Sequence, residues 1–112
     1  EVMNAPFEGA VLGNLGMLLA REGHLDEARA CFDEGARILR PLSATKLGRL
    51  LVTRARAEHV AGDSVAAQAA LREAEQLLTA IGPEAGPDLA DAIEEARAEM
   101  GTTGWGQPAP SP

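Results

Sequence analysis

Apolar residues recur every three to four positions along most of the chain, which is the spacing of amphipathic helices. Glycine and proline end these apolar stretches, as at Gly23, Pro41 and Gly62, and both residue types are characteristic of helix boundaries. The pattern therefore predicts an all-α protein with five helices, over residues 8–22, 25–40, 43–61, 64–81 and 87–100.

The first predicted helix carries leucines and glycines at helical spacing. Leu12, Leu15 and Leu19 fall on one face together with Gly16, and we expect this face to be buried. Gly13 and Gly16 would weaken an isolated helix. Their presence indicates that a second helix lies close against the first.

Residues 101–112 are rich in glycine and proline and lack a helical period, which is typical of a disordered tail or an extended linker. Trp105 stands in this tail as either an exposed aromatic residue or one that docks on this domain or on a partner. The predicted organisation is an N-terminal lead-in over residues 1–7, a helical domain over 8–100 and the tail over 101–112.

The second predicted helix superposes on the fourth when the sequence is shifted so that Gly23 falls on Gly62, with five identities and three similar pairs over seventeen positions. The matches fall on the predicted inner face and on the glycine between the helices, so they indicate a repeated helix pair. The identical pairs are Gly23 and Gly62, Ala28 and Ala67, Ala30 and Ala69, Glu34 and Glu73, and Leu39 and Leu78.

The first unit reads Leu12-x2-Leu15-Gly16-x2-Leu19, then Gly23, then Ala28-x3-Phe32, with Pro41 beyond. This resembles the tetratricopeptide repeat (TPR) family, whose pattern is W-x2-L-G-x2-Y…A-x3-F…P. The second unit keeps Leu51, Ala55, Gly62 and Ala67-x3-Leu71, but Arg54 and Glu58 replace residues that the family usually makes apolar. A half unit follows as Leu89-x2-Ala92-Ile93-x2-Ala96.

The resemblance implies an α-solenoid of antiparallel helix hairpins, with two TPR-like units and a C-terminal capping helix. The two units repeat with a period of about 40 residues, which is similar to that of TPR arrays in bacterial regulatory proteins. The expected function is to bind a peptide or protein segment in a concave groove, as part of a larger regulatory protein. The alternative is a structural module that caps a longer array or self-associates, as a homodimer through the uncapped first helix.

The resemblance also implies where a ligand would bind, because the first helices of successive TPR units line the groove. Asn14 with Arg49 resembles part of the carboxylate clamp of some TPR domains, so Asn14, Arg49 and Arg56 would hold an acidic group. The alternative is that these arginines are solvated on a helix face. The candidate binding residues are Asn14, Met17, Arg21, Arg49, Thr53, Arg56 and His59.

The formal net charge of −7 disfavours nucleic acids and anionic membranes as partners. His24 and His59 share no metal-ligand spacing, and Cys31 has no evident base, so we expect no catalysis, no metal and no cofactor. His24 lies in a predicted turn, where we expect it to help cap a helix. The unpaired Cys31 and the lack of a recognisable targeting signal favour the cytoplasm.

Overall fold

A computed structural model describes residues 5–101, and within this range the chain is helical with short connections and no strand. The prediction of an all-α protein is confirmed. None of the helices in residues 5–101 is long and apolar enough to cross a membrane. The helices are α1 (Ala5–Arg21), α2 (Leu25–Leu39), α3 (Ala44–Val60), α4 (Ser64–Ile81) and α5 (Gly86–Gly101), with a 3₁₀ turn η1 (Gly82–Ala85) before α5.

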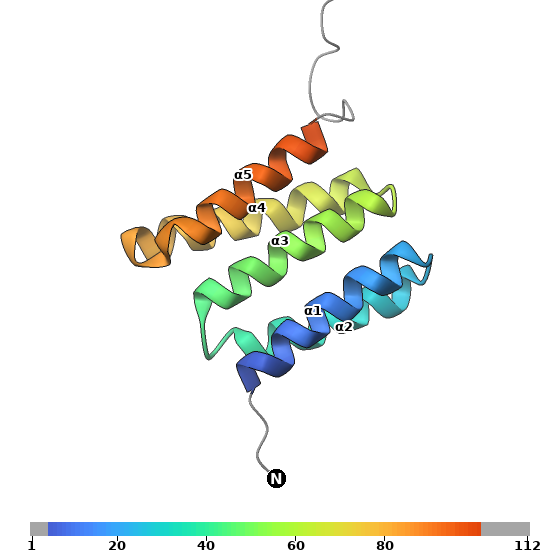
Figure 1. Cartoon of the computed structure of the whole chain (residues 1–112), viewed down its shortest axis with the longest axis horizontal. Helices are drawn as coiled ribbons and strands as arrows, with labels where there is room; N and C mark the ends of the chain where they lie inside the picture. Colours follow the sequence, from blue (N-terminus) through green and yellow to red (C-terminus); the bar gives the residue numbers. More distant parts are fainter. Residues whose placement is uncertain (1–4, 102–112) are drawn as a thin grey trace, which may run out of the picture.

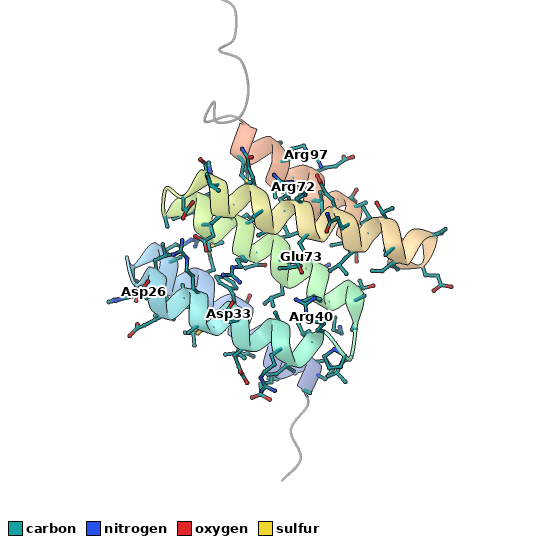
Figure 2. All side chains as sticks on the ribbon, turned by 180° about the vertical axis from the view of Figure 1, so that it is seen from behind. Asp26, Asp33, Arg40, Arg72, Glu73 and Arg97 are labelled. Carbon is teal, nitrogen blue, oxygen red and sulfur yellow. The ribbon has the colours of Figure 1, made fainter. Side chains whose placement is uncertain are left out.

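The helices form two layers. Figure 1 shows α1, α3 and α5 side by side in one layer, with α3 in the middle and α1 and α5 at the two edges. The second layer contains α2 and α4, which are in front when the molecule is seen from behind in Figure 2. α1 packs mainly on α2, and α3 mainly on α4, so that α3 connects the first pair of helices to the second pair and to α5.

The two turns within the helix pairs have the same geometry. Gly23 and Gly62 adopt φ angles of 88° and 91°, a left-handed conformation that glycine tolerates without strain. The next residue in each turn then donates a backbone hydrogen bond to a carbonyl five residues earlier, His24 to Leu19 and Asp63 to Glu58. The predicted repeat is therefore reproduced in the backbone of these turns.

Side-chain caps begin α3 and α4. Ser43 Oγ accepts a hydrogen bond of 3.1 Å from the Lys46 amide, and Asp63 Oδ1 accepts one of 2.9 Å from the Ala66 amide, which satisfies amides that have no partner inside the helix. His24 occupies the equivalent position before α2, but its side chain makes no capping hydrogen bond. The expectation that His24 helps to cap a helix is wrong, because its imidazole is turned towards Glu27, with Nδ1 3.9 Å from the Glu27 carboxylate.

The buried face of α1 differs from the one predicted. The residues buried in α1 are small, namely Gly9, Gly13, Gly16 and Ala20. Leu15 is exposed, and Leu12 and Leu19 are only half-buried. A β-carbon on Gly16 would lie 2.7 Å from Cζ of Phe32 in α2, closer than carbon atoms can approach. The helices of the first pair therefore touch through the side of α1 that has almost no side chains, so the predicted buried face is confirmed at Gly16 and wrong at Leu15.

The boundaries of the first and last helices also shift slightly. α1 begins at Ala5 rather than at residue 8, since Pro6 is tolerated in the first turn, where an amide has no helical partner. At the other end, the predicted loop over residues 82–86 is the 3₁₀ turn η1, followed directly by α5. Trp105, with the rest of the tail after Gly101, lies outside the described residues.

Candidate functional site

A groove runs between α1 and α3, close to the N-terminal end of α1. It encloses about 300 Å³. Its apolar wall combines small residues of α1 with leucines from the facing helices, which pack directly against the glycine face of α1. The apolar lining residues are Pro6, Ala10, Gly13, Leu39 and Leu50.

The polar wall of the groove comes mostly from α3. Lys46, Arg49 and Thr53 line it there, and Asn14 lines it from α1. Lys46 and Arg49 are three residues apart on one helix, so both project from the same face. The Thr53 hydroxyl donates a hydrogen bond of 3.2 Å to the Arg49 carbonyl, which leaves its oxygen available as an acceptor.

Lys46 and Arg49 are exposed, and neither has a carboxylate partner within residues 5–101. Most other cations are paired, as expected in a sequence where acidic residues outnumber basic ones by 17 to 10. The paired arginines of the described chain are Arg29, Arg37, Arg40, Arg54, Arg56 and Arg97. In this acidic protein, two adjacent cations beside an apolar groove are a candidate site for an anionic group.

The structure brings together three of the seven predicted binding residues. Asn14, Arg49 and Thr53 line one groove. Arg56 is engaged elsewhere, because its Nε and Nη2 donate hydrogen bonds of 3.1 and 2.9 Å to the Glu99 carboxylate of α5. A guanidinium held by both carboxylate oxygens is not free for a ligand.

The remaining three predicted residues do not line the groove. Met17 is partly buried and packs against the core. Arg21 is exposed at the last position of α1, and His59 is half-buried near the end of α3. The predicted site is therefore shortened to the part nearest the start of α1 and α3.

Sequence reasoning missed Lys46 and the leucines of the groove. The spacing of Lys46 from Arg49 was the available signal, since residues three apart share a helix face. Leu39 was placed on the inner face and Leu50 was not assigned, and both are buried while also lining the groove. The missing information was which residues Gly9 and Gly13 of α1 face, namely Leu39 and Leu50 respectively.

A second hollow of about 560 Å³ lies on the opposite face, between α2 and α4. Figure 2 shows Asp33, Arg40 and Glu73 on this side. Here the arginines are paired across helices: Arg40 with Glu73 at 3.4 Å, and Arg54 with Asp33 at 2.9 Å. Because these charges already neutralise one another, the hollow attracts an anion less strongly than does the groove with Lys46 and Arg49.

The turn between α3 and α4 carries a further charged network. Arg29 of α2 donates hydrogen bonds of 2.9 and 2.7 Å to Glu58 and one of 2.9 Å to Asp63. The hydrogen bond to Glu58 is the main cause that raises the Arg29 pKa. The amide of Ala66 lowers the pKa of the Asp63 carboxyl, with a smaller contribution from the Arg29 guanidinium. These contacts join α2 to the second helix pair, so they are structural.

No family model matches the chain, and comparison with curated proteins and with solved structures finds no match either. The function is therefore inferred from the residues of the chain and their geometry alone.

Proposed function

We propose that this protein is a non-catalytic binding module that holds an acidic segment of a peptide or protein in the groove between α1 and α3. Lys46 and Arg49 bind a carboxylate of the partner, and Asn14 adds amide hydrogen bonds. An apolar side chain next to that carboxylate lies against Pro6 and Ala10 at the apolar wall. The observation that carries this proposal is that Lys46 and Arg49 have no acidic partner within residues 5–101, beside an apolar wall.

Charge and desolvation both favour such a ligand. A carboxylate bound at a partly apolar wall gains charge-assisted hydrogen bonds that are stronger than neutral ones. The apolar wall contributes by removing a neighbouring side chain from water. Neither wall alone would discriminate one ligand from another, whereas the two together favour an acidic residue flanked by an apolar one.

We further propose that the chain is a TPR-like repeat, with the two helix pairs as units of a solenoid and α5 as its cap. The sequence pattern and the recurrence of the same turn at Gly23 and Gly62 support this proposal. In such an array the groove between the first helices of successive units is the peptide-binding surface, which is where Lys46 and Arg49 lie. A role inside a larger regulatory protein of a bacterial cytoplasm belongs to the same proposal.

The test is selection of ligands from a random peptide library, followed by fluorescence anisotropy with the enriched peptides. We expect the enriched peptides to contain an Asp, a Glu or a free C-terminal carboxylate beside an apolar residue. Lys46→Ala and Arg49→Ala should each weaken binding by roughly ten- to a hundredfold, since a charge-assisted hydrogen bond contributes about 1.5 to 3 kcal/mol.

Arg72→Ala is the matched control. Arg72 is another exposed arginine without an acidic partner in the described chain, but it lies on the opposite face, as Figure 2 shows. Its removal changes the net charge equally and should leave affinity within about twofold. Enrichment of basic peptides, or equal losses for Arg49→Ala and Arg72→Ala, would contradict the proposal.

A further inference from the structure

The outer face of α1 is apolar and exposed. Val11, Leu15 and Leu18 are 44%, 43% and 54% exposed, and their spacing of four and three residues places them on one side of the helix. This side is opposite to the glycines that contact α2 and α3. Figure 1 shows that α1 lies at an edge of its layer, with α3 on its inner side.

The equivalent face of α3, found by superposing the two repeat units, is buried against a neighbouring helix pair. When Gly23 is superposed on Gly62, Val11 corresponds to Leu50 and Leu18 to Ala57. Both equivalents in α3 are buried, and Leu50 reaches the α1–α2 pair, where it would collide with a β-carbon on Gly13. The exposed face of α1 is thus the counterpart of the face through which α3 joins its neighbouring helix pair.

The two faces differ in charge. In α3, Arg54 and Glu58 reach the first pair through ion pairs with Asp33 and Arg29. The equivalent positions in α1 are Leu15 and Leu19. The partner of α1 therefore needs no charges at these positions, and an uncharged apolar face is complementary to another of the same kind.

The opposite edge of the molecule does not provide that partner. The surface of α1–α2 that receives Leu50 contains Gly13 and Gly35. Its counterparts in the second pair, Val52 and Ala74, are buried, and α5 packs on both helices that carry them. A second copy consequently cannot add head to tail, but it can present its own α1.

We propose that two copies of this chain associate through the outer face of α1, with Val11, Leu15 and Leu18 of each copy in the contact. Such a contact uses the same surface twice, so it closes as a two-fold dimer and forms no filament. Three half-exposed side chains bury much less area than the about 800 Å² per partner of a standard interface. The dimer is therefore weak and dissociates on dilution. The groove between α1 and α3 lies on another side of α1.

Sedimentation equilibrium of the full 112-residue chain over a wide concentration range tests the proposal. We expect the average mass to rise from one chain towards two with concentration. Leu15→Glu and Leu18→Glu should remain monomeric over the same range, with unchanged far-UV circular dichroism. Val65→Glu is the control, because Val65 is 78% exposed on α4, away from this face, and should associate like the natural chain. A monomer at all concentrations, or association unaffected by Leu15→Glu, overturns the proposal.

Disulfide trapping locates the contact. In a Cys31→Ser background, Leu15→Cys places the only thiol on the proposed face, and Val65→Cys places it on the control surface. Mild oxidation should give a covalent dimer many times faster for Leu15→Cys, because the two thiols are held near the symmetry axis. Equal rates for the two variants would mean that collisions, and not an α1 interface, form the bond.

Discussion

Glu58 is buried at 1% exposure near the end of α3, and both of its carboxylate oxygens accept hydrogen bonds from Arg29 of α2. A buried carboxylate is tolerated only when it is paired and hydrogen-bonded. Arg54 adds a second cation, with its Nε 3.8 Å from the same carboxylate. Glu58 carries a negative charge where the repeat pattern has an apolar residue. This charge is neutralised by Arg29, which lies 29 positions away in the other helix pair.

Removal of Arg29 should destabilise the protein more than loss of a surface ion pair would. Arg29→Ala leaves the Glu58 carboxylate buried, with Arg54 as a weaker partner, and we expect a loss of about 2 to 3 kcal/mol in the free energy of unfolding. Urea denaturation followed by circular dichroism at 222 nm measures this change. The double variant Arg29→Leu with Glu58→Leu should recover most of the stability, because no unpaired charge remains.

Arg37→Ala is the control for this experiment. Arg37 pairs with Glu34 on the exposed surface of α2, where water and salt screen an ion pair so that it contributes little to stability. If Arg29→Ala and Arg37→Ala lower the free energy of unfolding equally, the buried carboxylate is not what makes Arg29 important.

Gly16→Leu should strongly destabilise the first helix pair. A β-carbon at this position would already lie 2.7 Å from Phe32 Cζ, so a leucine must displace the ring or separate α1 from α2. Overpacking of this kind costs about 1 to 3 kcal/mol, and a thermal melt shows it as a lowered Tm. Leu18→Met, at an exposed position of the same helix, should leave the Tm nearly unchanged.

Acid should weaken the cap of α4. The pKa of Asp63 is lowered in the folded protein by the Ala66 amide and by Arg29, so the carboxylate form stabilises the fold. This stabilisation is complete above the unfolded value near 3.8 and is lost as the pH falls through the lower folded value. Asp63→Asn keeps a capping oxygen but cannot titrate.

The comparison with Asp63→Asn isolates this carboxylate from the other acidic groups. The difference in Tm between the natural chain and Asp63→Asn should favour the natural chain at pH 7 and shrink as the pH falls below about 4. Glu34, whose pKa is also lowered, titrates equally in both proteins. A difference in Tm that stays constant down to pH 2 would show that the Asp63 charge does not contribute.

Helix positions could be predicted from local signals, whereas the packing faces could not. Ser43, Asp63 and the two turn glycines act within a few residues of themselves, so their effect is visible in the sequence. The buried face of α1 depends on how closely α2 approaches. Gly16 indicated a close neighbouring helix, as found, but the spacing of Leu12, Leu15 and Leu19 did not reveal that Leu15 would be exposed.

The geometry of the candidate site was predictable to the same extent. Asn14, Arg49 and Thr53 were grouped correctly because they follow from the register of neighbouring helices. Arg56 was not excluded, because its partner Glu99 lies 43 residues away on α5 and no local signal joins them. Pairing between distant charges decides which arginines are free, and that information appears only when the helices are placed in space.

Ala10→Trp tests the shape of the groove without altering any charge. Ala10 lines the groove and is exposed, so an indole at this position occupies the space between α1 and α3 that we assign to the apolar side chain of the ligand. Stability should change by less than about 1 kcal/mol, because no buried contact is displaced. Affinity for the selected acidic peptides should fall about tenfold, although Lys46 and Arg49 are intact. If peptides bind Ala10→Trp as tightly as the natural chain, the cations act alone and the apolar wall plays no part in recognition.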